Sequence, residues 1–132
     1  MTTLRQLAER VRDGRSMEIE LGDFLDAFYR QPTADAVSEA PPPLAGAHPR
    51  GAWLDAFLAA VAEHLCRRFE RPIPGWVFES GRSLERPYFA LEAPSFRATL
   101  LLESPAAFRS RNLFITANAL SRASEHASKE AA

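Results

Sequence analysis

A thirteen-residue block, Glu103–Ile115, concentrates polar side chains whose types and spacing suit a binding site. Arg109 and Arg111 have the planar guanidinium group that binds carboxylates and phosphates through paired hydrogen bonds, and Asn112 adds an amide that reads a polar edge. This pattern predicts a surface for an anion or an acidic partner. A structural alternative pairs Arg109 with Glu103 and places Asn112 in the left-handed conformation that commonly follows a helix.

Nucleophilic catalysis and metal binding find no support in the spacing of histidine and cysteine. His64 and Cys66 are two residues apart, so on a helix their side chains point about 200° away from each other and form no dyad. His48, His64, His126 and Cys66 show no paired spacing typical of a metal site. Glycine-rich phosphate loops and the common hydrolase motifs are also missing from the sequence. We therefore predict no catalytic residue, no cofactor and no metal, and we expect a protein that is not an enzyme.

The charges nearly balance, with 16 basic and 17 acidic side chains and a net charge of −1. Such a chain lacks the overall basic field of many nucleic-acid-binding proteins. The second half is slightly basic, which keeps a DNA- or RNA-binding regulator as the alternative function. Its phosphate contacts would come from C-terminal arginines, namely Arg67, Arg68, Arg97 and Arg122 together with Arg109 and Arg111.

Cellular location is predicted from cysteine content and from the N-terminal residues. Cys66 is the only cysteine, so no disulfide can form within the chain. The first residues lack the basic start and apolar run of a signal peptide. No apolar run approaches the roughly 20 residues that span a bilayer. We expect a cytoplasmic protein with no membrane partner.

Hydrophobic periodicity predicts how the 132 residues are organised. Apolar residues at helical spacing indicate a helical hairpin over residues 1–30, and six punctuating prolines and glycines indicate a linker or surface loop over 31–49. A broad apolar stripe over 50–70 predicts a central helix within a core domain spanning 50–123. Residues 124–132 are expected to be a frayed tail. The fold class is mainly α, with at most one short two-stranded element.

Shorter elements are expected in the C-terminal half. Residues 96–102 fit either a strand or a helix, and we favour a helix with Ser95 as its N-cap. Ser104 and Pro105 predict the start of a second short helix that ends near Arg109. The remaining expectations are a helical turn over 87–90, an extended run over 113–115, and a last helix from Thr116 through Leu120, Ala123 and Ala127.

From Trp53 onward the chain resembles a family of small uncharacterised proteins from actinobacteria and similar GC-rich genomes. The segments that carry the resemblance are Leu65–Arg68, Pro72–Trp76, Pro87–Phe89, Glu103–Ile115 and Leu120–Ala123. Glu103–Ile115, which reads ESPAAFRSRNLFI, is the most specific of them. Some members of this family follow a helix-turn-helix DNA-binding domain, and others stand beside nucleotidyltransferase-like toxin genes. Residues 1–30 are too short for a full five-helix repressor domain.

The resemblance implies an antitoxin-like or regulatory protein with a protein as its partner. We predict that the chain occludes a toxin, and a homo-oligomer is a further possible form. It supplies no catalytic residue. We predict that an apolar patch ringed by arginines makes the contact, with Trp76, Arg109, Arg111, Asn112 and Phe114 as the partner-binding residues. A third reading, an enzyme or small-molecule binder, would use an aromatic pocket around Trp76 and Tyr88.

Overall fold

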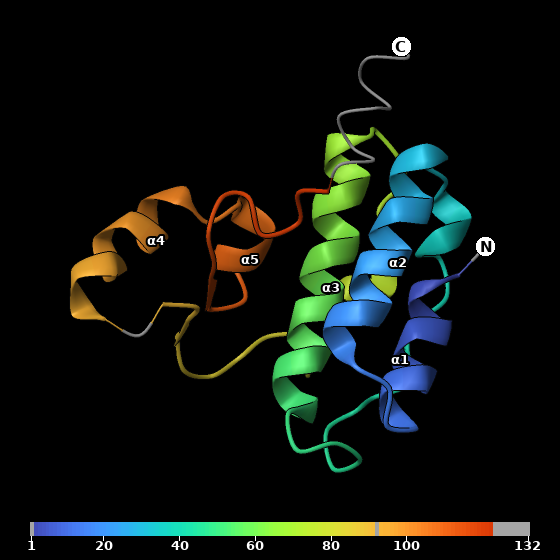
Figure 1. Ribbon diagram of the computed structural model, residues 1–132, viewed down its shortest axis with the longest axis horizontal. Helices are drawn as coiled ribbons and strands as arrows, with labels where there is room; N and C mark the ends of the chain where they lie inside the picture. The colour runs from blue at the N-terminus through green and yellow to red at the C-terminus, as the bar shows by residue number, and fades with distance from the viewer. Residues whose placement is uncertain (1, 92, 123–132) are drawn as a thin grey trace.

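The computed structural model describes residues 2–91 and 93–122 and has the mainly α fold expected from the sequence (Figure 1). A short parallel sheet pairs two strands of two residues each. The helices are α1 (Leu4–Arg12), α2 (Met17–Arg30), α3 (Gly51–Arg68), α4 (Arg97–Glu103) and α5 (Ala106–Arg109). The strands are β1 (Tyr88–Phe89) and β2 (Leu113–Phe114), and the 3₁₀ turns are η1 (Ala34–Ala36), η2 (Gly75–Phe78) and η3 (Pro94–Phe96).

The expected N-terminal hairpin is formed by α1 and α2, which pack against each other. Thr3 opens α1 with a capping box, in which its hydroxyl accepts from the Gln6 N–H and its own N–H donates to the Gln6 side chain. Ser16 caps α2 by accepting from the Ile19 N–H. Gly14 makes the turn between them at φ 103°, a conformation that few other residues adopt.

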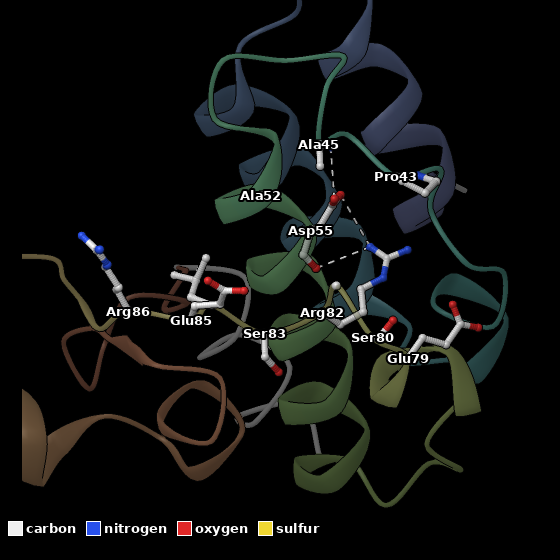
Figure 2. A pocket seen from close by; sticks show the side chains of 12 residues that line it. Pro43, Ala45, Ala52, Asp55, Glu79, Ser80, Arg82, Ser83, Glu85 and Arg86 are labelled. Carbon is white, nitrogen blue, oxygen red and sulfur yellow. Dashed lines mark hydrogen bonds and ion pairs between the residues drawn. The ribbon is translucent and has the colours of Figure 1, made fainter.

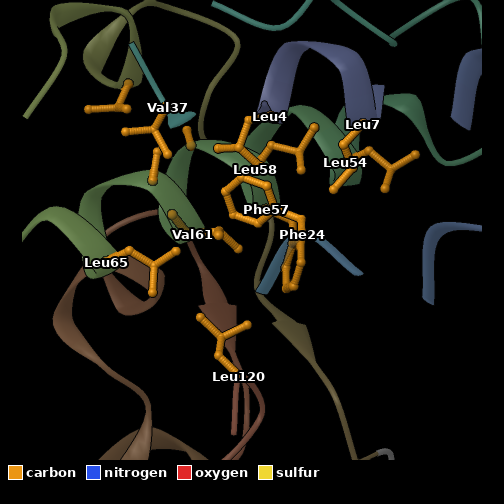
Figure 3. Close-up of a cluster of buried hydrophobic side chains, with 14 of the residues drawn as sticks. Leu4, Leu7, Phe24, Val37, Leu54, Phe57, Leu58, Val61, Leu65 and Leu120 are labelled. Carbon is orange, nitrogen blue, oxygen red and sulfur yellow. The ribbon is translucent and has the colours of Figure 1, made fainter. Parts of the chain in front are cut away.

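The central helix α3 is buried around most of its circumference, with 13 of its 18 residues buried. A helix that is apolar on nearly every side requires neighbours on nearly every side. Figure 1 shows α3 standing between the hairpin and the C-terminal elements. Figure 3 shows side chains from α1, α2, the loop and α3 meeting in one cluster, which also reaches Leu120. Residues from 1–30, 31–49 and 50–123 therefore share a single continuous core.

The Pro-rich segment 31–49 is a loop that is fastened to this core. Val37 and Leu44 are completely buried, and Pro41 is buried as well. Where the loop meets α3, Gly51 allows a very close approach, since a Cβ atom there would lie 2.0 Å from the Leu44 carbonyl oxygen. The loop thus packs as part of the domain.

The C-terminal half contains α4, α5 and the small sheet. Strand β1 pairs in parallel with β2, with Tyr88 opposite Leu113 and Phe89 opposite Phe114. Residues 97–103 form the helix that we favoured over a strand, and the predicted extended run begins as β2. The sheet pairs the segment before α4 with the segment after α5. The chain between the two strands leaves the body, and α4 projects from it (Figure 1).

Several local predictions are wrong. Tyr88 and Phe89 form a strand, because their backbone pairs with the chain after α5. Ser95 caps no helix, since it lies inside η3 and α4 follows without a side-chain cap.

Two expectations for the end of the chain also need revision. Ser104 is the C-cap of α4, and Pro105 precedes α5. Residues 117–120 form turns in place of the expected last helix. Ala123, Ala127 and the predicted tail 124–132 lie outside the described residues.

Candidate functional site

A groove of about 550 Å³ lies between the Pro-rich loop and the chain that follows η2 (Figure 2). Asp55 and Arg82 form its floor. The Asp55 carboxylate accepts hydrogen bonds from the N–H groups of Leu44 (2.8 Å) and Ala45 (3.1 Å). Arg82 donates to the Pro41 carbonyl at 2.8 Å, and its Nη1 lies 3.8 Å from Asp55 Oδ1. These bonds fasten the loop to α3.

The charges on the groove floor are therefore committed to internal partners. Burial lowers the pKa of the Arg82 guanidinium from its ordinary value, although Asp55 and Glu79 act in the opposite direction. Figure 2 shows Arg82 and Asp55 directed toward each other, while Arg86 on the rim points away. Asp55 and Arg82 therefore have a structural role, which is to hold the Pro-rich loop against α3.

Arg111, which the sequence predicted at a partner surface, is 3% exposed and lies inside the protein. Its guanidinium donates to Glu63 Oε1 (2.8 Å), to the Ala107 carbonyl (2.7 Å) and to the Val77 carbonyl (2.9 Å). Burial by itself raises the pKa of Glu63, but hydrogen bonds from Arg67 and Arg111 together hold that pKa below its ordinary value. Arg111 therefore joins α5 and η2 to α3 and offers no donor to a partner in this structure.

Asn112 and Trp76 are also turned to internal hydrogen bonds. Asn112 adopts φ 64°, the left-handed conformation of the structural alternative, and its Nδ2 donates to the Leu84 carbonyl at 2.7 Å. The Trp76 indole donates to the Val37 carbonyl at 2.8 Å, and the residue is buried. Both side chains hold segments of the chain together through these hydrogen bonds, and Asn112 is half-buried.

Arg109 and Phe114 remain closer to the surface. Arg109 is exposed on α5, and within the described residues no ion pair joins it to Glu103. Phe114 is half-buried and stacks on Phe89 with ring centroids 5.0 Å apart. The guanidinium of Arg97 lies 5.1 Å from the centroid of the same Phe89 ring. Phe114 thus lies near the base of α4.

The four arginines proposed for nucleic-acid contacts each have a neighbour that engages them. Arg67 bonds to Glu63, and Arg122 forms a paired contact with Asp26 at 3.0 and 2.9 Å. The guanidinium of Arg68 lies over the Tyr29 and Phe69 rings, and Arg97 lies over Phe89. Arg67 and Arg68 lie at the C-terminal end of α3, Arg97 lies on α4, and Arg122 lies against α2.

The residues considered for catalysis lie mostly in the interior. Cys66 is buried, and burial raises the pKa of its thiol. The half-buried His64 ring packs edge-on against Phe108. Over residues 2–91 and 93–122, no group of three or more His, Cys, Asp or Glu side chains is placed to hold a metal ion. Nor does any helix in those ranges have the length and apolar character needed to cross a membrane.

The feature that stands out is an arm, residues 94–103, made of η3 and α4. Figure 1 shows α4 set apart from α1, α2 and α3. Leu100 is the only residue of α4 that is buried. Just after the helix, the buried Ser104 hydroxyl accepts from the Ile115 N–H at 2.8 Å and lies 2.6 Å from the Leu100 carbonyl. The arm is therefore tied to the body at its C-terminal end.

The outer side of the arm is apolar and exposed to solvent. Within the described part of the chain, four of the six exposed large hydrophobic side chains lie between residues 91 and 102. Phe96 (46% exposed), Leu101 (46%) and Leu102 (82%) belong to the arm, and Leu91 (39%) lies three residues before it begins. Single exposed hydrophobic residues are ordinary on protein surfaces, but a group of them on one projecting element marks an interaction site.

The role of the arm was not predicted from the sequence, although the sequence contains a signal for it. Leu100, Leu101 and Leu102 are consecutive, and on a helix three consecutive side chains spread over about 200°. A short helix that packs one side on the body must then expose the others. Ser104, which fastens the arm, was expected only as a helix cap because its partner Ile115 lies eleven residues further along.

The arm is thus the described surface best suited to contact another macromolecule, whereas the polar groups predicted for binding are largely used within the chain. Comparison of the chain with family models, curated proteins and solved structures finds no match.

Proposed function

We propose that this chain is a non-enzymatic protein-binding module that contacts its partner through the arm. The observation that carries the proposal is the exposed apolar side of η3 and α4, with Leu102 82% exposed. Leaving such side chains in water costs free energy that association recovers, at about 25 cal/mol per Å² of apolar surface buried. Phe96 supplies the aromatic side chain that anchors many interfaces, and it is followed directly by the cationic Arg97.

In its most specific form, the proposal is an antitoxin-like cytoplasmic protein whose arm occludes a site on a toxin. A short helix that projects from the body and exposes apolar side chains is suited to enter a groove on another protein. The single cysteine, buried in α3, is compatible with a reducing compartment. The contact residues proposed now are Phe96, Arg97, Leu101 and Leu102, with Arg109 and Phe114 near the base of the arm.

A paired substitution tests the proposed function. We expect the double variant Leu101→Asp/Leu102→Asp to lose its protein partner when the tagged chain is recovered from its native host, because charged side chains cannot enter an apolar contact. Quantitative mass spectrometry of the co-purifying proteins is the measurement. The control is Ile19→Asp, which places one such charge at an exposed apolar residue (66% exposed) on α2, away from the arm. Recovery of the same partner by both variants would refute the proposal.

The nucleic-acid alternative draws less support, because Arg67 and Arg122 are engaged by carboxylates and Arg97 lies on a different element. It requires binding that weakens steeply as salt rises, since counterions are released from the phosphates. Nucleic acid recovered with wild-type protein and lost with Arg67→Ala/Arg122→Ala, rather than with the arm variant, would favour this alternative.

A further inference from the structure

The exposed side of α4 has a regular composition. Ala98 is followed three and four residues later by Leu101 and Leu102, so these side chains share one face of the helix. All three are exposed, while Leu100 turns to the body. The face therefore has a small residue near its N-terminal end and two large ones a turn later, so an antiparallel copy would place its leucines over this small residue.

The charges at the ends of α4 are placed against its own dipole. Arg97 begins the helix and Glu103 ends it, both side chains are exposed, and the first turn has no acidic residue and the last turn no basic one. The helix dipole is positive at the N-terminus and negative at the C-terminus, so it favours the opposite arrangement. A partner helix that runs antiparallel and carries the same charges would correct both ends.

We infer that a second copy of this chain occupies the arm, with the two α4 helices paired antiparallel about a two-fold axis. This pairing brings Arg97 to the same end as Glu103 of the second copy, and the relation repeats at the other end, as an isologous contact requires. A net charge of −1 presents little general repulsion between copies. The inference rests on the proposed function, because it concerns regulation of the same face: self-pairing covers the arm until a protein partner displaces the second copy.

The size of the contact sets its strength. A seven-residue helix is about 10 Å long, so it covers less than the roughly 800 Å² per partner of a standard interface. We therefore expect a weak dimer that dissociates on dilution. A weak pair of this kind is readily displaced by a partner that binds the arm more tightly, which suits a masking role.

Sedimentation velocity over a range of protein concentrations tests the pairing. Wild-type protein is expected to shift from monomer to dimer as concentration rises, with Leu102→Asp raising the dissociation constant about tenfold or more. The control Ile19→Asp should dimerise as the wild type does, because Ile19 lies on α2. A wild-type chain that stays monomeric up to about 1 mM, or a dimer unaffected by Leu102→Asp, would overturn the inference.

A charge exchange tests the antiparallel geometry and does not depend on the stability of any one variant. Arg97→Glu places like charges at each end of the homodimer, as does Glu103→Arg, so each variant alone should dimerise less than the wild type. Mixing the two variants should restore dimers, because each end of the mixed pair then joins Glu with Arg. Dimers in both separate samples, or none in the mixture while the wild type dimerises, would contradict this pairing.

The two proposals fail in different ways. If the arm is monomeric at all concentrations but the arm variants lose a protein partner, the self-pairing is wrong and the proposed function stands. If the charge exchange behaves as expected and the arm variants keep their partner, the second copy occupies the arm and the partner binds elsewhere. A partner that lowers the dimer fraction on addition to wild-type protein would support masking directly.

Discussion

Buried ion pairs have the largest consequences at the scale of single residues. Arg111 and Glu63 are 3% and 6% exposed, and their charged groups meet at 2.8 Å. We expect Arg111→Ala to lower the free energy of unfolding by about 3 kcal/mol, since it leaves a buried carboxylate with only the peripheral Arg67 and removes two further hydrogen bonds. Urea unfolding is the measurement. Arg109→Ala, two residues away and exposed, should change stability by less than about 0.5 kcal/mol, and equal effects would contradict this account.

The same carboxylate predicts a pH dependence of stability. The pKa of Glu63 is lowered in the folded protein, so the folded state favours its ionised form more than the unfolded chain does. Its stabilising contribution is therefore present above the ordinary value of 4.5 and is lost as the pH falls through the lower folded pKa. Unfolding midpoints measured toward acidic pH should fall more steeply for the wild type than for Glu63→Gln. Parallel curves for the two proteins would show that another group causes the loss of stability at acidic pH.

At the scale of elements, the joint between the Pro-rich loop and α3 depends on a missing side chain. A Cβ atom at Gly51 would lie 2.0 Å from the Leu44 carbonyl oxygen and 2.3 Å from its carbon, so Gly51→Ala forces backbone to move. We expect a loss of about 2 kcal/mol by thermal unfolding, as for overpacked sites. Gly75→Ala has nothing within 4 Å of the added Cβ and should be neutral or slightly stabilising. A Gly51→Ala protein as stable as Gly75→Ala would mean that the loop shifts freely.

Elements that depend on interactions between residues close in sequence were predicted, and elements that depend on distant partners were not. The hairpin and α3 follow from apolar spacing and from nearby caps such as Thr3, and all three helices were expected. Strand β1 was missed because Tyr88 pairs with Leu113, which lies 25 positions along the chain. A two-residue strand has too short a pattern to indicate itself without its partner.

The candidate site was harder to predict than the fold for the same reason. The sequence identified Arg111 and Trp76 as notable residues but placed them at a surface. Arg111 meets Glu63 48 positions away, and Trp76 meets Val37 39 positions away, so neither contact leaves a local pattern. The arm was expected as a helix, but its exposure follows from how the rest of the chain fills the core around α3.

At the scale of the whole molecule, one core joins the N-terminal hairpin to the last described residues. Among the α-helices in the described ranges, α4 of the arm is the one with a single buried residue, Leu100. Substitutions on its outer face should therefore change association without changing the fold. This separation between a stable body and a projecting contact element is what makes the proposed function and the self-pairing testable in the intact chain.

A final consequence concerns the order in which the protein can be completed during synthesis. The Tyr29 hydroxyl donates to the Leu120 carbonyl at 2.7 Å, and Arg122 covers Gly22 while bonding to Asp26. These contacts span more than 90 positions, so α2 cannot make them until Leu120 and Arg122 have left the ribosome. The apolar circumference of α3 emerges earlier, with part of its packing still to be made. The nascent chain therefore passes through a stage with exposed hydrophobic surface, at which chaperones act.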